Sequence, residues 1–320
     1  MQLIELSLDT THEAVDWVCT LLAETIDITD VQITQYLADS DTQDVVNSNW
    51  TFTIHLYLPN DAQVRRRIEK IENLLSPLHR TGLATAIETT VVEEKLPNAD
   101  IQSPFVHRIG KRFIVQAPDA SDQSQTADEI TIRIQKTLSF GSGLHPATIL
   151  SLQLLERHIL PTMNVLDLGS GSGILSVAIA KLGANVLALD NDSIAVQATQ
   201  DAVRLNQVEQ KVTVMQGSLG CGSEMGHWMG KDTINNVAKI DTVEAFDLIV
   251  ANILARIHIA LADDFRQALR HTSLQTGLLI TAGFTTDHEE SVTAALTAAG
   301  FAIIDCVRFN EWVALVHRLN

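Results

Sequence analysis

The sequence has few cysteines, no long hydrophobic run and, over its first 64 residues, no lysine or arginine. The three cysteines, Cys19, Cys221 and Cys306, lie far apart among 320 residues. An odd number of widely spaced cysteines excludes a disulfide framework and a cysteine-based metal knuckle. We therefore expect free thiols and no bound metal ion.

Segments that would take the chain to or across a membrane are also missing. No apolar run approaches the roughly 18 residues that a membrane span requires. The N-terminus lacks the basic region and apolar core of a secretory signal. With 46% hydrophobic and 19% charged residues, the composition is that of a globular protein. We expect a cytoplasmic protein that is long enough for two domains.

The missing basic residues leave the start of the chain strongly acidic. Residues 1–64 contain eleven acidic residues, and the first basic residue is Arg65. The net charge of -17 argues against a direct nucleic acid partner. The acidic end could steer a basic partner toward it. The alternative is a solvated acidic surface that keeps the protein soluble.

Residues 164–190 have the pattern of a nucleotide-binding half-unit. A short apolar strand, Val165–Leu168, is followed by a glycine turn, by a helix up to Gly183, and by a second apolar strand that ends on Asp190. The turn glycines are Gly169, Gly171 and Gly173. In such a unit the ligand lies over the turn at the helix N-terminus, and the acid accepts hydrogen bonds from a ribose.

The spacing of the glycines distinguishes between two nucleotides. The dinucleotide fingerprint is G-x-G-x-x-G, but here the turn reads G-x-G-x-G, and Ile174 occupies the position of the last glycine. This spacing resembles the first motif of S-adenosylmethionine-dependent methyltransferases more than an NAD site. An ordinary glycine-rich turn is the alternative.

The order of predicted elements indicates two domains. Residues 1–115 read as a small α+β domain of ferredoxin-like βαββαβ order, in which no catalytic constellation is found, so we expect a recognition domain. Residues 116–137 start with a polar run and are expected to be a linker. Residues 138–320 alternate strands and helices, which predicts a doubly wound α/β sheet closing on an antiparallel hairpin. Within this domain we expect Ser193 to cap a helix, a continuous helix over 257–269, and a loop over 217–242.

Four motifs in order resemble one family. They are FGSGLHPAT at 140–148, DLGSGSGIL at 167–175, VANILA at 250–255 and EWVAL at 311–315. The first resembles the FGTGTHPTT signature of the ribosomal protein methyltransferases of the PrmA type. The others resemble that family's glycine motif, its V-A-N-I-L-A and its closing strand. The match covers residues 138–320 well and the N-terminal domain loosely.

The resemblance implies a fold, an activity and a set of site residues. It implies a class I methyltransferase fold that uses S-adenosylmethionine to methylate lysine or N-terminal amino groups of the large-subunit ribosomal protein eleven. Gly169 would let the methionine moiety approach the backbone, Gly171 would also bind the cofactor, and Asp190 would bind the ribose hydroxyls. Thr148 would contact the cofactor. Asn252 would contact the cofactor and position the incoming amine.

Other interpretations stay open at this point. Thr148 could merely cap a helix that starts at Ile149, and Asn252 could be a turn residue after a strand. The substrate could be another protein or a small-molecule amine. The chain could also be an S-adenosylmethionine-binding protein without catalytic activity.

Overall fold

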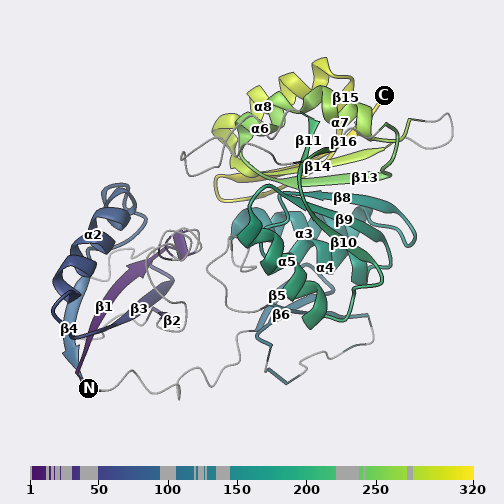
Figure 1. Cartoon of the computed structure of the whole chain (residues 1–320). Coiled ribbons are helices and arrows are strands. Elements are labelled where there is room, and N and C mark those ends of the chain that lie inside the picture. Colours follow the sequence, from purple (N-terminus) through teal and green to yellow (C-terminus); the bar gives the residue numbers. More distant parts are fainter. Residues whose placement is uncertain are drawn as a thin grey trace. The chain divides into compact units, whose positions relative to one another are not determined.

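The computed structural model describes most of the chain as two compact units (Figure 1). The described residues are 2–11, 14–15, 18, 22, 31–36, 50–93, 106–118, 120–121, 126, 128–134, 145–220, 238–240, 243–271 and 277–320. Of these residues, 2–93 and 145 belong to the first unit, and 106–134 and 146–320 belong to the second. Residues 106–115, which we expected in the N-terminal domain, thus fall in the second unit.

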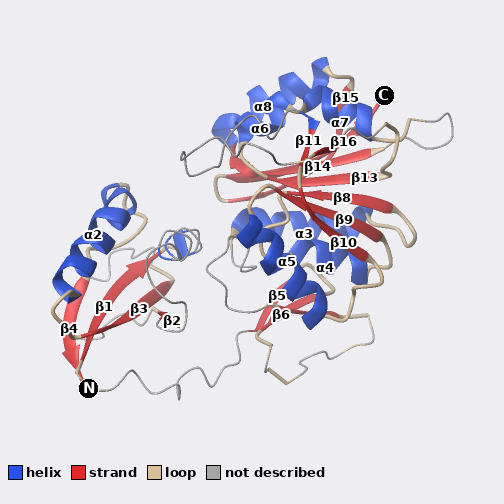
Figure 2. Cartoon of the chain, viewed as in Figure 1, coloured by secondary structure: helices blue, strands red, loops and turns tan. Residues whose placement is uncertain are grey.

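The first unit is a four-stranded antiparallel sheet packed on helices (Figure 2). Its elements are β1 (Leu3–Thr10), β2 (Val31–Gln35), β3 (Phe52–Pro59), α2 (Val64–Arg80) and β4 (Glu88–Val92). The strand order β2-β3-β1-β4 confirms the predicted ferredoxin-like arrangement.

Buried and partly exposed side chains alternate along β1, so one face of this sheet packs against the core. Ile4, Leu6 and Leu8 are buried and pack against Ile71 and Leu75 of α2. The core also holds three helical residues of the segment between β1 and β2, which are Val15, Val18 and Leu22. The intervening residues of β1 point to the opposite face because side chains alternate along a strand.

The second unit is built on a seven-stranded sheet of order β10-β9-β8-β13-β14-β16-β15. Its strands are β8 (Asn164–Leu168), β9 (Asn185–Asp190), β10 (Val212–Gln216), β13 (Leu248–Asn252), β14 (Leu278–Thr285), β15 (Phe301–Phe309) and β16 (Trp312–Leu319). The first five strands in that order are parallel, and β16 runs antiparallel between β14 and β15. This arrangement confirms the predicted doubly wound sheet with a terminal hairpin.

Helices cover both faces of the seven-stranded sheet (Figure 1). One layer contains α3 (Pro146–His158), α4 (Ile174–Lys181) and α5 (Ser193–Leu205), and the other contains α6 (Ala255–Ala260), α7 (Ala262–Ala268) and α8 (Thr286–Ala298). Two expectations were wrong in detail. Asp192, not Ser193, caps α5, because its carboxylate accepts the Ile194 N–H at 2.8 Å. The helix expected over 257–269 is broken at Leu261 into α6 and α7.

Two small sheets complete the second unit. β5 (Val106–Ile109) and β6 (Phe113–Gln116) form an antiparallel hairpin, and β6 also pairs in parallel with β7 (Ile130–Arg133). The expected loop over 217–242 contains two short paired strands, β11 (Ser218–Leu219) and β12 (Lys239–Ile240). Residues 221–237 and 241–242 of that loop and residues 140–144 of the FGSGLHPAT motif lie outside the described residues. In the described part of the chain, no helix is both long and apolar enough to cross a membrane.

Candidate active site

The predicted site residues gather where the strand order of the large sheet reverses. From β8 the order proceeds through β9 to β10 on one side and through β13 to β14 on the other. Ligands of open parallel sheets bind at the carboxyl ends of the strands beside such a switch point. Gly169 follows β8, Asp190 ends β9 and Asn252 ends β13. Three adjacent strands therefore bring these residues to one edge.

The glycine turn after β8 has a left-handed backbone that only glycine adopts readily. The φ angles of Gly169, Gly171 and Gly173 are 77°, 54° and 80°. A Cβ atom on Gly173 would lie 2.9 Å from the Cα atom of Thr199, so α5 packs directly on the turn. The Leu189 carbonyl accepts the N–H groups of Gly169 and Ser170 at 2.8 and 3.0 Å. These contacts fix the conformation of the turn.

Thr199 is a second link between α5 and the turn, and sequence reasoning missed it. Its buried hydroxyl oxygen lies 2.9 Å from the Ser170 hydroxyl and donates to the Gly171 carbonyl at 3.0 Å. A threonine in the middle of a helix gives no local indication of such a role. The contact depends on how α5 packs against the turn.

Asp190 lies at the edge with its carboxylate already oriented by the backbone. One oxygen accepts the Gly171 N–H at 2.9 Å, and the other accepts the Asp192 N–H at 3.0 Å. A carboxylate offers about four lone-pair positions, so both oxygens can still accept hydroxyl donors. Because Asp190 is only half-buried, a ribose diol could reach it.

Asn252 and Thr148 meet across the switch point. The Asn252 side-chain nitrogen lies 3.4 Å from the Thr148 hydroxyl, a long hydrogen bond. The other amide atom, Oδ1, is buried and has no hydrogen-bond partner among the described residues. A buried acceptor left unpaired costs free energy, so such an atom needs an explanation. An incoming N–H group would supply the missing donor.

The alternative role for Thr148 does not agree with the helix boundaries. Helix α3 begins at Pro146, where proline is favoured because its missing N–H would be unpaired anyway. Thr148 is therefore inside the first turn and not at the cap, and it is 1% exposed. Its hydroxyl faces Asn252.

A glycine in β14 makes room beside Asn252. The register between β14 and β16 shifts between Thr281 and Phe284, and Gly283 in this bulge has φ 90°. A Cβ atom there would lie 2.5 Å from the Ile253 carbonyl oxygen and 3.0 Å from Asn252 Oδ1. A glycine inside a strand pattern indicates a bulge or a close backbone approach, so this feature could have been predicted from the sequence.

Asp167 lies on β8 directly behind the turn and is fully buried. One of its carboxylate oxygens accepts the Ser176 hydroxyl at 2.5 Å, and the other has no partner among the described residues. Burial raises the pKa of this carboxyl from 3.8 to about 7, and the charge of Asp190 adds to the rise. The two acids at this edge thus have different environments, and of the two only Asp190 is partly exposed.

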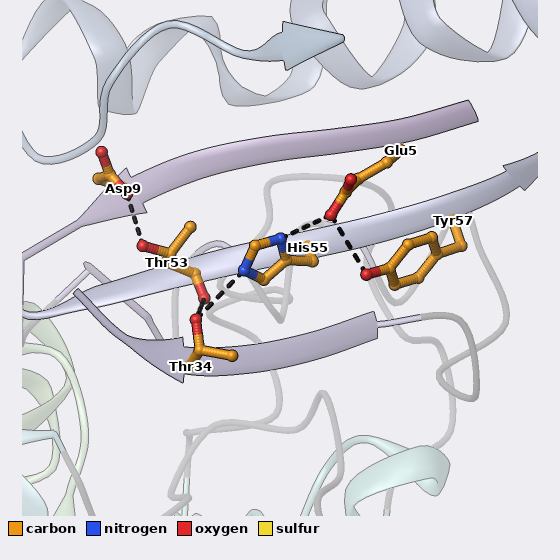
Figure 3. Close-up of polar contacts among 6 residues, drawn as sticks. All are labelled: Glu5, Asp9, Thr34, Thr53, His55 and Tyr57. Atoms are coloured by element: carbon orange, nitrogen blue, oxygen red, sulfur yellow. Dashed lines mark hydrogen bonds and ion pairs between the residues drawn. The ribbon is translucent and has the colours of Figure 1, made fainter. Parts of the chain in front are cut away.

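The first unit carries a separate polar cluster that sequence reasoning did not find (Figure 3). Glu5 Oε1 lies 2.9 Å from His55 Nδ1 and accepts the Tyr57 hydroxyl at 3.2 Å. His55 Nε2 lies 3.2 Å from the Thr34 hydroxyl. Nearby, the Thr53 hydroxyl donates to Asp9 at 2.7 Å. These bonds link β1, β2 and β3, so we assign the cluster a structural role in this sheet.

We expect Gly283→Ala to lower the free energy of unfolding by about 2 kcal/mol, because alanine is strained at this φ and its Cβ would push the Ile253 peptide. Gly300→Ala is the matched control, since Gly300 has φ 95° and its nearest neighbour would lie at 3.9 Å. Urea denaturation of both variants separates the backbone strain, which they share, from the clash. Equal losses would show that the bulge is not tightly packed against Ile253.

The chemistry of this edge fits S-adenosylmethionine. A half-buried carboxylate stands where a ribose would lie, left-handed glycines line the turn, and a buried amide oxygen lacks a donor among the described residues. No group of three or more His, Cys, Asp or Glu residues in the described part of the chain could hold a metal ion.

Comparisons with known proteins agree with this geometry. Residues 2–320 match the family described as ribosomal protein L11 methyltransferase (PrmA). The chain is 42% identical over 272 residues to a ribosomal protein L11 methyltransferase of Chloroflexus aurantiacus, covering 83% of this chain and 81% of the relative. It is 34% identical over 328 residues to the protein of that name from Herpetosiphon aurantiacus, covering 99% of each.

A solved structure is similar as well. It is the ribosomal protein L11 methylase of Lactobacillus delbrueckii subsp. bulgaricus, at a TM-score of 0.52 and 26% identity. The alignment covers 67% of this chain and 99% of the solved one.

Proposed function

The chain belongs to the ribosomal protein L11 methyltransferase (PrmA) family, and we propose that it transfers methyl groups from S-adenosylmethionine to amino groups of ribosomal protein L11 in the cytoplasm. The second unit has the class I methyltransferase fold. The observation that carries the proposal is the convergence of Asp190, the glycine turn and the unpaired Asn252 oxygen at one switch point.

The proposed roles follow from the chemistry of each group. When bound, S-adenosylmethionine supplies an electrophilic methyl group. Asp190 holds the ribose hydroxyls, and Gly169 and Gly171 leave room for the methionine moiety along the backbone. Thr148 contacts the cofactor and supports the Asn252 amide. Asn252 Oδ1 accepts a hydrogen bond from an N–H group of the substrate amine and so directs the nitrogen lone pair toward the methyl carbon.

The amine has to lose a proton before it can attack. A lysine side chain has a reference pKa near 10.4, so on the order of one in a thousand is neutral at pH 7. A buried amide oxygen carries no charge and does not stabilise the ammonium form as a carboxylate would. At the Asn252 position an amide therefore positions the amine while leaving it able to release the proton.

The first unit is proposed to recognise the protein substrate. Residues 1–64 contain eleven acidic residues and no lysine or arginine, which favours a basic partner. A cofactor site alone gives no selectivity for one protein substrate over another. A separate recognition unit with these acidic residues would supply that selectivity.

The experiment is transfer of a radiolabelled methyl group to purified ribosomal protein L11. We expect incorporation that falls at least about tenfold in Asn252→Ala, because the amine is no longer positioned. No incorporation despite tight cofactor binding would favour a non-catalytic protein, and incorporation into other substrates alone would show a different target.

The same assay tests the first unit. A chain lacking residues 1–105 should keep its cofactor affinity, which serves as the folding control, and should lose most of its activity on L11. Undiminished methylation of L11 by this chain would contradict the recognition role.

A further inference from the structure

A buried histidine holds together the two backbone segments that border Asn252. His258 lies in α6 and is 0% exposed. Its Nε2 atom lies 3.1 Å from the Ile253 carbonyl oxygen and 2.9 Å from the Ala282 carbonyl oxygen. Because both oxygens can only accept, Nε2 must carry the hydrogen and donate to both in a three-centre bond.

The two carbonyls belong to residues beside the site. Ile253 directly follows Asn252, and Ala282 directly precedes Gly283. The Ile253 N–H also donates to the Ala282 carbonyl at 3.1 Å. The Ile253 residue is therefore held through both its N–H and its carbonyl, and His258 provides the second connection.

Packing alone does not explain why this residue is a histidine. The ring lies among apolar groups, with its centroid 5.4 Å from that of Phe284 and 6.3 Å from that of Phe265. Burial lowers the pKa of His258 from 6.5 to about 4, so the ring is neutral near pH 7. Its Nδ1 atom has no partner among the described residues, so an apolar side chain would fill this space at lower cost. What the imidazole adds is one N–H donor.

The side chain of Asn252 depends on this backbone for its position. Its side-chain hydrogen bond to Thr148 is long at 3.4 Å, and its Oδ1 atom has no partner within the described part of the chain. A small shift of the Ile253 peptide would therefore move Oδ1 without breaking a strong bond. Gly283 allows the two segments to lie so close, and His258 keeps them there.

We propose that His258 is a positioning residue for methyl transfer: its Nε2–H joins the segment after β13 to the bulge in β14 and thereby fixes Asn252 Oδ1 at the substrate amine. The inference rests on the proposed role of Asn252. His258 lies outside the set of residues that the glycine motif and strand ends predict, because its contribution depends on the fold of the segment and not on a motif.

The experiment compares His258→Leu, His258→Gln and, as a matched control, His317→Leu in the full-length chain. His317 is also buried, its Nε2 lies 3.1 Å from the Thr281 hydroxyl, and burial likewise lowers its pKa to about 4. We expect H258L to lower kcat for L11 methylation by about tenfold to a hundredfold, with KM for S-adenosylmethionine and its Kd by calorimetry changed less than about threefold. H258Q keeps an N–H donor and should recover most of kcat. H317L should lose thermal stability but keep kcat.

A double-mutant cycle with Asn252→Ala separates positioning from a general loss of packing. If His258 acts through Asn252, adding H258L to N252A should lower kcat little further. If the two substitutions lower kcat independently, so that the fold-losses of H258L and N252A multiply in the double variant, the inference is overturned. Equal losses of kcat in H258L and H317L, or no recovery of kcat in H258Q, would also overturn it. If H258L does not fold, His258→Met, which also lacks the donor, takes its place. An N252A chain with unchanged kcat would instead contradict the proposed role of Asn252, a separate failure.

Discussion

Replacing Asp190 by asparagine should weaken S-adenosylmethionine binding by about a hundredfold or more, measured by calorimetry. Hydrogen bonds to a charged acceptor contribute about 1.5–3 kcal/mol each, and two ribose hydroxyls would lose such a partner. The amide also has a single acceptor oxygen, whereas the carboxylate now accepts the N–H groups of Gly171 and Asp192 on different oxygens. One of these donors would then face an NH₂ group.

Two controls test whether the loss of affinity in D190N comes from the contact with the ribose. Asp192→Asn removes a charge two residues away, but asparagine caps a helix about as well as aspartate, so cofactor affinity should stay within about twofold. The second control changes the ligand. A 2′-deoxy analogue of S-adenosylhomocysteine should bind the unaltered chain more weakly than the parent compound, and D190N should bind both about equally. A D190N chain that still discriminates between them would exclude Asp190 as the ribose ligand.

The residues that could be predicted from sequence share one property. Gly169, Gly171, Asp190 and Asn252 each stand at or just after the end of an apolar strand, and the carboxyl ends of parallel strands meet at one edge. Once the strands are assigned, their convergence follows from topology alone. The doubly wound sheet and the terminal hairpin were also predicted from sequence, because a chain of alternating strands and helices has few possible connections.

Features that depend on packing between distant segments were not predictable. The hydroxyl of Thr199 reaches the glycine turn only because α5 lies against it, and His258 reaches Ala282 only because α6 folds back over β14. The sequence also did not predict that residues 106–116 belong to the second unit. The chain from 116 to 129 has the composition of a linker, yet it connects two paired strands, β6 and β7, of the same sheet. Composition does not say which strands pair.

Two buried aspartates of the second unit differ in their surroundings, and these surroundings decide whether removal of the negative charge raises or lowers the free energy of unfolding. Asp167 and Asp247 are 0% and 5% exposed. Asp247 has a cation beside it, because the Arg270 guanidinium donates to it at 2.6 Å, and it also accepts the Asn164 N–H at 2.8 Å. Asp167 accepts a hydrogen bond from the Ser176 hydroxyl, and it forms no ion pair with any of the described residues. Nothing in the sequence around either residue indicates this difference.

Asp167→Asn should therefore stabilise the chain at neutral pH, and the gain should disappear in acid. Because the folded-state pKa of Asp167 is raised from 3.8 to about 7, the native chain retains a proton that the unfolded chain releases between these values. Stability of the unaltered chain then falls as pH rises from about 4 to 7 and is flat above, by at most about 4 kcal/mol. Asparagine imitates the protonated carboxyl, keeps an acceptor for Ser176 and removes this slope.

Urea denaturation of the cofactor-free chain from pH 4 to pH 8 measures the difference between D167N and the unaltered protein. The difference should be near zero at pH 4, grow by up to about 1.4 kcal/mol per pH unit, and level off above pH 7. Asp247→Asn is the contrasting variant. It leaves the Arg270 charge without its partner, so it should destabilise the chain at neutral pH by about 3 kcal/mol. A D167N chain that is less stable than the parent at pH 7.5 would mean that the carboxylate is charged and satisfied in the fold, and that the Asp167 side chain reaches a donor other than Ser176.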